Sequence, residues 1–196
     1  GIVIGMKYLY NKLFNRIATT DLIIYLLKEI QKQKLNYKIG FIGGSNDVAK
    51  KSMQYFNDFY GINNIVYSYE PEYLDINKLI NKNDKHTLQC IIDGINKVNL
   101  DILFIGLGCP KQEIFANTIF NHTTIKVFIP CGGLFNYYAE KHKRAPLWMQ
   151  NWGIEWTFRL ILEPKRLWKR YLIGNYKYLL LLIKKKYNYI HMISLF

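Results

Sequence analysis

Short apolar runs alternate with stretches of helical periodicity through most of the chain. Helices are expected after Thr19 or Thr20 as N-cap, over residues 48–60, and from Lys111 to about residue 121. This alternation predicts an α/β fold with a mainly parallel sheet of Rossmann-like order. The apolar runs expected to be buried strands, each ending near a turn, are residues 37–42, 64–68, 101–106 and 126–130.

The pattern changes in the C-terminal part of the chain. Residues 148–162 and 164–182 keep a helical spacing, are rich in aromatic and basic residues, and give no strand signal. The apolar run at residues 178–183 can lie on a bilayer but is too short to cross one, which takes roughly 18 to 20 residues. We therefore expect a core at residues 1–142 and a helical membrane-associating appendage at residues 143–196.

Charge is concentrated in the same part of the chain. The sequence has 27 Lys and Arg against 14 Asp and Glu, a net charge of +13. Residues 141–196 alone carry 12 of the basic residues and only two acidic ones, so +10 of this excess lies there. A local basic surface favours a polyanionic partner, which leaves phosphate, anionic lipid and nucleic acid as candidates.

The metal-binding and redox residues are sparse. Three cysteines stand far apart in apolar or glycine-rich surroundings, which is typical of reduced cytoplasmic thiols and not of a disulfide framework or a zinc site. The four histidines show no metal-ligand spacing. These residues predict no metal site, and we also expect no cofactor.

Three glycine turns follow predicted strands at what would be the same edge of the sheet. Ligands of such sheets bind beyond the carboxyl ends of the strands, although a tight connection needs the same glycines for steric reasons alone. The second turn leads into a helix that begins with Lys111, Gln112 and Glu113, a polar cluster that a simple connection does not require. Lys111 stands where a dinucleotide-binding fingerprint would have its third glycine, so that class of site is not favoured. The candidate contacts in the turns are Gly43, Gly44, Ser45, Gly106, Gly108, Gly132 and Gly133.

The basic aromatic segment holds further candidates. Arg159, Arg166 and Arg170 are spaced by seven and four residues, close to one helical face, although Pro164 interrupts the path. With Arg144 they can bind a diphosphate with bidentate geometry. All four tryptophans lie within 21 residues, which suits the interface between lipid head groups and acyl chains. The alternative is a solvated basic helix whose tryptophans complete the core.

Five stretches of the chain are similar to one known family. The sequence resembles the WecG/TagA/CpsF family of bacterial glycosyltransferases, and the resemblance covers nearly the whole chain. The longest of the five, KRAPLWMQNWGIEWTFRLILEPKRLWKRYLIGN, has an unusual composition that makes chance similarity improbable. The stretches are residues 16–21, 41–45, 101–113, 132–135 and 143–175.

This resemblance implies an inverting, metal-independent enzyme. It would move N-acetylmannosamine, its uronic acid or a hexose from a UDP-sugar to an undecaprenyl-diphosphate-linked sugar. The product would enter teichoic acid, enterobacterial common antigen-like material, capsule or exopolysaccharide. The enzyme would be peripheral on the inner face of the plasma membrane, with an anionic lipid surface as partner, no nucleic acid, and a homo-oligomeric state left open.

The resemblance also implies roles for single residues. Arg16 would be an active-site cation and Gln112 a polar contact near the sugar, and Arg159 and Arg166 would meet the lipid diphosphate. The remaining donor contacts that we expect are Thr20, Asp21, Tyr69, Tyr73 and Asn136, the tyrosines by stacking on uracil. Asn136 stands where the family often has an aspartate, and Glu140 where it usually has a small residue.

The start of the sequence bears on catalysis. The chain has no initiator Met and no signal-peptide pattern at Gly1, so it is expected to begin inside a longer protein. The family's candidate catalytic aspartate would lie about three positions before Gly1, and Asp21 is the weaker substitute. Two other readings follow, a catalytically inactive membrane-associated remnant and, with less support, a nucleic-acid-binding module with steeply salt-dependent affinity.

Overall fold

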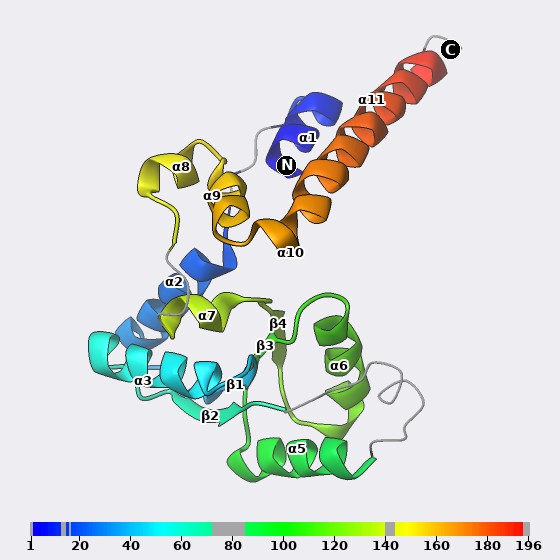
Figure 1. Cartoon of the computed structure of the whole chain (residues 1–196). Coiled ribbons are helices and arrows are strands. Elements are labelled where there is room, and N and C mark those ends of the chain that lie inside the picture. Colours follow the sequence, from blue (N-terminus) through cyan, green and yellow to red (C-terminus); the bar gives the residue numbers. More distant parts are fainter. Residues whose placement is uncertain (1, 13–14, 16, 72–84, 140–143, 194–196) are drawn as a thin grey trace. The chain divides into compact units, whose positions relative to one another are not determined.

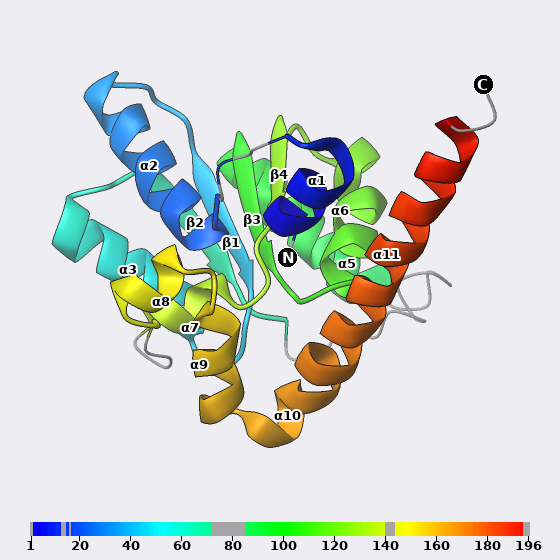
Figure 2. The ribbon, with the colours of Figure 1, turned by 90° about the horizontal axis from the view of Figure 1, so that it is seen from above.

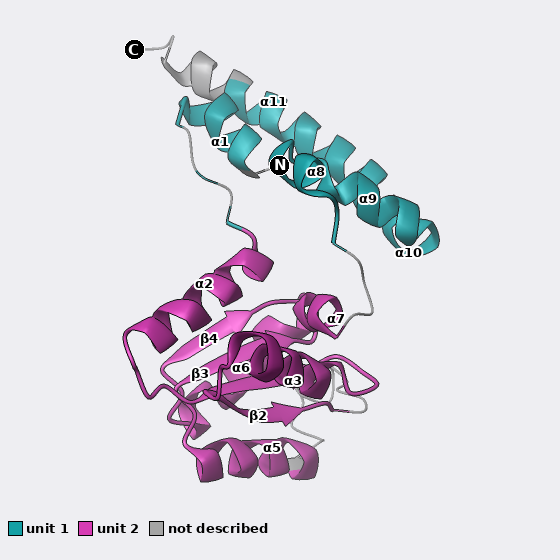
Figure 3. Ribbon diagram, turned by 90° about the vertical axis from the view of Figure 1, so that its left-hand side faces the viewer, with its two compact units in different colours: residues 1–17, 144–196 teal, residues 18–143 magenta. Residues whose placement is uncertain are grey.

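The chain forms two compact units, which Figure 3 shows in different colours. In the computed structural model, residues 2–12, 15, 17–71, 85–139 and 144–193 are described. One unit, residues 18–143, is called the α/β unit below. The other, called the helical unit, combines residues 1–17 with residues 144–196.

The α/β unit is built on a four-stranded parallel sheet, as the alternating pattern predicted (Figure 1). Its strands are β1 (Ile39–Gly43), β2 (Ile65–Tyr69), β3 (Ile102–Gly106) and β4 (Val127–Pro130), in the order β2-β1-β3-β4. The chain runs outward from β1 to β2 and then returns to the far side of β1 to form β3. The strand order therefore reverses between β1 and β3.

Helices cover both faces of this sheet. Figure 2 shows α2 (Thr19–Lys32) and α3 (Val48–Tyr60) on one side, and α5 (Lys85–Val98) and α6 (Lys111–Ile119) on the other. The short helix α7 (Leu134–Tyr138) packs on α3, and a 3-10 turn (Phe120–His122) follows α6.

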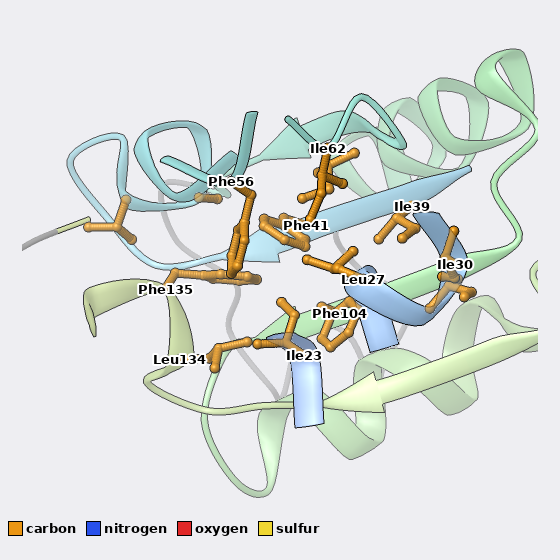
Figure 4. Packing of buried hydrophobic residues seen from close by; sticks show 14 residues of the cluster. Ile23, Leu27, Ile30, Ile39, Phe41, Phe56, Ile62, Phe104, Leu134 and Phe135 are labelled. Atoms are coloured by element: carbon orange, nitrogen blue, oxygen red, sulfur yellow. The ribbon is translucent and has the colours of Figure 1, made fainter. Parts of the chain in front are cut away.

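The two faces have separate apolar cores. Phe41 of β1 is fully buried in the first core, with its ring centroid 4.8 Å from that of Phe135 and 5.6 Å from that of Phe104 (Figure 4). Ile42 points to the opposite face and belongs to the second core, beneath α5 and α6. Because neighbouring residues of a strand face opposite sides, a strand that is buried on both faces reads as a continuous apolar run.

Asp101 ties three strands together at the amino edge of the sheet. Its carboxylate accepts a hydrogen bond from the backbone N–H of Lys38 at 2.9 Å and from Lys126 Nζ at 2.6 Å. These two bonds, that of Lys126 first, hold the pKa of Asp101 below its ordinary value of 3.8. The carboxylate therefore favours the folded state as long as it is ionised.

The pH dependence of stability tests the role of these two hydrogen bonds. Because the folded-state pKa of Asp101 is lowered, its contribution is present above the unfolded-state pKa of about 3.8 and disappears as the pH falls through the folded-state value. We expect Asp101→Asn to lower the free energy of unfolding at about pH 7, and the difference from wild type to shrink below about pH 4. Denaturant titrations across this range measure it. Lys126→Met should show a smaller loss, since the bond to Lys38 remains; a pH-independent difference would contradict the assignment.

The helical unit brings the two ends of the sequence together. Its first helix, α1 (Ile2–Tyr10), packs against its last, α11 (Gly174–Ile193). Gly5 allows this close approach, because a Cβ at that position would collide with the hydroxyl of Tyr178 and lie 3.2 Å from Leu182. From the sequence, residues 1–142 were expected to form the core. The structure instead groups residues 1–17 with the C-terminal segment, because α1 packs against α11.

The C-terminal segment is more interrupted than its periodicity predicted. One helix was expected over residues 148–162, but α8 (Leu147–Asn151) and α9 (Glu155–Leu162) are separate, because Gly153 adopts a positive φ of 73° between them. The expected second helix is divided into α10 (Pro164–Trp168), a π-helical turn (Lys169–Ile173) and α11. Within the described ranges, none of the helices is both long enough and apolar enough to span a bilayer.

Candidate active site

The carboxyl ends of β1 and β3 meet at the point where the strand order reverses. Gly43, the last residue of β1, pairs in register with Gly106, the last residue of β3. Open parallel sheets bind their ligands in the crevice outside such a switch point. Because β4 runs parallel to β3, the turn at Gly132 and Gly133 lies at the same edge. The structure thus brings the three predicted glycine turns to one edge of the sheet.

Two of these glycines are required by packing. A Cβ on Gly43 would lie 2.5 Å from the carbonyl carbon of Gly106, so the two backbones touch where side chains would otherwise stand. A Cβ on Gly106 would lie 2.7 Å from the ring of Phe135 and 2.9 Å from the carbonyl oxygen of Gly132. These positions match the steric reading of the glycine turns.

Two other glycines face open space. Gly108 has a φ of 78° and Gly132 a φ of 56°, and a Cβ built on either would meet no heavy atom within 4 Å. Their left-handed backbone favours glycine, and no described residue crowds their α-carbons. A ligand can therefore approach the backbone closely at both turns. Gly44 is different, since a Cβ there would collide with Val48.

Gln112 joins the turns after β3 and β4. Its side chain is buried in the first turn of α6, where Oε1 accepts a hydrogen bond from the backbone N–H of Gly132 at 3.0 Å. Its Nε2 donates to Glu113 Oε1 at 2.8 Å. Lys111 begins the same helix and is half-buried. The predicted polar cluster at this helix terminus is therefore an organised group in which Gln112 fixes the Gly132 turn.

The turn after β1 is held by a carboxylate of the protein itself. Gly43, Gly44 and Ser45 were candidate ligand contacts, and a phosphate in this turn would meet the N-terminus of α3. Instead, the carboxylate of Glu70 accepts hydrogen bonds from the backbone N–H groups of Asp47 and Ala49 at that terminus. A phosphate could reach these donors only by displacing Glu70.

The other donor contacts expected in the α/β unit lie on three elements. Tyr69 is the half-buried last residue of β2, and Asn136 lies on α7. Thr20 is buried in α2, and its carbonyl oxygen accepts a hydrogen bond from Tyr138 at 2.6 Å. Asp21 lies in the first turn of α2, where its negative charge interacts favourably with the positive end of the helix dipole.

The predicted N-cap of α2 was wrong. The helix begins at Thr19, and Ala18 is the N-cap, with no capping bond from its side chain. The reason is that Ala18 has extended backbone angles, and its carbonyl oxygen already closes the first turn by accepting from Leu22 N at 2.9 Å. Arg16, Tyr73 and Glu140 lie outside the described residues.

The cysteine at this edge has a thiol that favours its protonated form. Cys131 follows β4 directly, and its burial raises the pKa of its thiol far above the ordinary value. A thiol that stays protonated is a poor nucleophile and a poor metal ligand. Among the residues that the structure describes, no three His, Cys, Asp or Glu residues gather into a group that could hold a metal ion.

The arginines of the helical unit lie on successive elements, and Arg159 and Arg166 have acidic partners. Arg159 of α9 bonds to the buried Glu155 at 3.0 Å. Arg166 of α10 makes a two-point contact with Glu163, with Nη2 lying 2.8 Å from Oε1. Arg170 is exposed in the π-helical turn, and Arg144 precedes α8.

Sequence reasoning missed the roles of Glu70 and Tyr138. Both side chains bond to backbone groups that are 21 or more positions away along the chain. Such contacts leave no local pattern. The only signal for Glu70 was its place two residues after the predicted strand at residues 64–68, at the edge where the glycine turns gather.

Comparison with known proteins identifies the family. The profile of the "Glycosyl transferase WecG/TagA/CpsF family" matches residues 1–191. Three similar proteins carry the name N-acetylglucosaminyldiphosphoundecaprenol N-acetyl-beta-D-mannosaminyltransferase. The one from Bacillus subtilis (strain 168) is 32% identical over 96% of this chain and 67% of its own length. Those from Staphylococcus aureus (strain MRSA252) and Bacillus spizizenii are 26% and 28% identical, over 95% and 88% of this chain and 68% and 61% of their own lengths.

The chain thus spans about two thirds of the length of these relatives. The family profile covers the α/β unit with its glycine turns and nearly all of the helical unit. The chain belongs to the WecG/TagA/CpsF family of glycosyl transferases.

Proposed function

We propose that this glycosyltransferase moves N-acetylmannosamine from a UDP donor to N-acetylglucosaminyl-diphospho-undecaprenol during assembly of a cell-wall polymer. The observation that carries the proposal is the family match over residues 1–191, together with the shared name of the similar proteins. Of the three donor sugars implied by the sequence resemblance, that name favours N-acetylmannosamine over its uronic acid or a hexose.

The donor is proposed to bind at the switch point of the sheet. The open backbone at Gly108 and Gly132 supports this place, since both turns leave room for a phosphate or a sugar beside the chain. Lys111 supplies a cation at the same edge. Gln112, the next residue of α6, fixes the Gly132 turn beside this helix terminus. Tyr69, at the end of β2, is the candidate for stacking on uracil.

The reaction makes two demands on the protein. A base must take the proton from the acceptor hydroxyl as that oxygen attacks the anomeric carbon, and positive or hydrogen-bonding groups must stabilise the UDP that departs from the opposite face. In the proposed inverting, metal-independent route, Arg16 and backbone N–H groups meet the second demand. The family resemblance implies an aspartate for the first role.

The helical unit is proposed to meet the lipid acceptor at the inner face of the plasma membrane. Leu147, Trp152, Ile161 and Leu181 of this unit are between 64% and 77% exposed, although large apolar side chains normally avoid water. Cationic side chains accompany them, including the exposed Arg170 and the Lys184–Lys186 run. Apolar side chains beside cations suit an anionic bilayer, and arginines suit a diphosphate.

The test of the function is a UDP-release assay on the full-length protein. We expect UDP release only when UDP-N-acetylmannosamine and undecaprenyl-diphosphate-linked N-acetylglucosamine are both present. UDP release with a different UDP-sugar would show that the donor is that sugar nucleotide and not UDP-N-acetylmannosamine. Failure across a panel of UDP-sugars, with the protein folded and the acceptor supplied, would refute the proposal and favour the inactive remnant.

A second experiment tests the membrane surface. Leu179, Leu180 and Leu181 are about half to two thirds exposed on α11, at 53%, 48% and 64%. Changing all three to serine should weaken binding to vesicles with anionic lipid at least about tenfold, because apolar area that would enter the bilayer is removed. Vesicle sedimentation measures this binding.

The matched control changes exposed aromatic residues of the α/β unit. Tyr25→Ser and Phe59→Ser remove side chains that are 68% and 72% exposed, and vesicle binding should stay as in wild type. Equal losses in both sets of variants would contradict the assignment. Tight DNA or RNA binding at physiological salt without vesicle binding would favour the nucleic-acid alternative.

A further inference from the structure

A carboxylate from β2 holds the turn that follows β1. Glu70 comes directly after the last residue of β2, which pairs with Ile42 of β1. Its Oε2 accepts a hydrogen bond from Asp47 N at 2.7 Å, and its Oε1 accepts one from Ala49 N at 2.6 Å. Hydrogen bonds of N–H groups to an ionised carboxylate are shorter and stronger than those between neutral groups. One side chain therefore fastens the turn between β1 and α3 from the neighbouring strand.

These bonds replace a local cap. The first N–H groups of a helix have no partner within the helix and are usually satisfied by the side chain of the N-cap residue. Asp47 is the N-cap of α3, but its side chain makes no capping bond. Glu70 supplies that acceptor instead. Its negative charge also lies at the positive end of the helix dipole, so the place where an external anion would bind is already filled.

The turn needs such a restraint because of its backbone. Asn46 and Asp47 both adopt left-handed angles, with φ of 59° and 61°, although neither is a glycine. Residues other than glycine pay a conformational cost in this region, a smaller one for Asn and Asp than for most, and bonds from the surroundings offset it. On the opposite side, the backbone of Gly43 lies against that of Gly106. The turn is thus held between the switch point and Glu70.

We infer that Glu70 is a positioning residue for the donor. It keeps residues 43–47 in the conformation that forms one wall of the switch point. Its carboxylate also occupies the N-terminus of α3, so that no other anion binds there. The donor diphosphate is then left to the turns at Gly108 and Gly132, where the backbone is open. This inference rests on the proposed function, because it assigns Glu70 to the binding of the UDP-sugar.

The experiment compares three variants of the full-length enzyme. Glu70→Ala removes both acceptor oxygens, and Glu70→Gln keeps one. Asp101→Ala is the matched control, because that carboxylate also accepts from a backbone N–H, at 2.9 Å, but at the opposite edge of the sheet. We measure KM for the UDP-sugar, kcat, and hydrogen exchange of the backbone N–H groups in residues 43–49.

For Glu70→Ala we expect KM to rise about tenfold or more while kcat changes less than about threefold, since a misplaced binding wall weakens donor binding more than it changes the chemistry. Exchange in residues 43–49 should accelerate. Glu70→Gln should fall between Glu70→Ala and wild type. Asp101→Ala should lose stability but keep its KM and its exchange rates at residues 43–49.

The outcomes separate this inference from the proposed function. Faster exchange with an unchanged KM would show that Glu70 is only structural and would overturn the inference. Unchanged hydrogen exchange in residues 43–49 of Glu70→Ala would show that Glu70 does not restrain the turn. Absence of transfer in wild type and control alike would instead refute the proposed function, and the inference with it, while the exchange data would still decide whether Glu70 holds the turn.

Discussion

We expect Gly43→Ala to lose about 2 to 4 kcal/mol of unfolding free energy and nearly all donor binding. The added Cβ would lie 2.5 Å from the carbonyl carbon of Gly106 and 2.6 Å from its oxygen, and neither backbone atom can rotate away. The residue would also be strained by its φ of 123°. Relief requires β1 and β3 to separate at the switch point, where the donor is proposed to bind. Denaturant unfolding and UDP binding by calorimetry measure the two effects.

Gly61→Ala is the matched control for this prediction. Gly61 also has a positive φ, of 62°, but the nearest atom to a Cβ there is Gln31 Nε2 at 3.8 Å. The variant should lose only about 1 kcal/mol, the usual cost of alanine at a left-handed helix cap, and should bind UDP normally. If both variants behaved alike, the backbone contact between Gly43 and Gly106 would not be the cause.

The second large effect is expected from Gln112→Ala. The change leaves Gly132 N without its acceptor and frees the turn after β4 from the turn after β3. We expect transfer to fall about a hundredfold, because small displacements of a positioned group cost orders of magnitude in rate. The loss in unfolding free energy should stay near 1 to 3 kcal/mol, about the cost of one unsatisfied buried group. Steady-state kinetics and denaturant unfolding report the two values.

Gln89→Ala is the control for Gln112. Gln89 of α5 also donates from Nε2 to a carboxylate on its own helix, to Asp93 at 2.8 Å, but it is exposed and this bond does not hold a glycine turn. Its loss should leave kcat and KM unchanged. Wild-type kinetics in the Gln112→Ala variant would show that Gln112 has no role in the active site.

The fold was predictable where the signal is local. Each strand is a short apolar run that ends near a turn, so the parallel sheet and the three glycine turns could be placed from the sequence. The ends of the strands were off by one or two residues, because backbone pairing, which sets them, involves residues of other strands. β2, for example, runs to Tyr69 and not to residue 68.

What the sequence did not predict depends on contacts between distant residues. The packing of Gly5 against Tyr178 joins positions at opposite ends of the chain, so nothing in the N-terminal run signals it. The break at Gly153 was hidden because a glycine in a periodic segment is compatible with either a continuous or an interrupted helix. At the site, the glycines were found, but the polar groups that hold them, Gln112 and Glu70, bond across 20 to 23 positions.

The mass of the lipid product shows directly whether the enzyme transfers N-acetylmannosamine to the lipid acceptor. Full-length protein is incubated with UDP-N-acetylmannosamine and N-acetylglucosaminyl-diphospho-undecaprenol, and the lipid fraction is analysed by mass spectrometry. We expect the lipid to gain the mass of one N-acetylhexosamine residue, and to gain it only when both substrates are present. A lipid of unchanged mass, obtained with folded protein and intact substrates, would refute the proposed transfer.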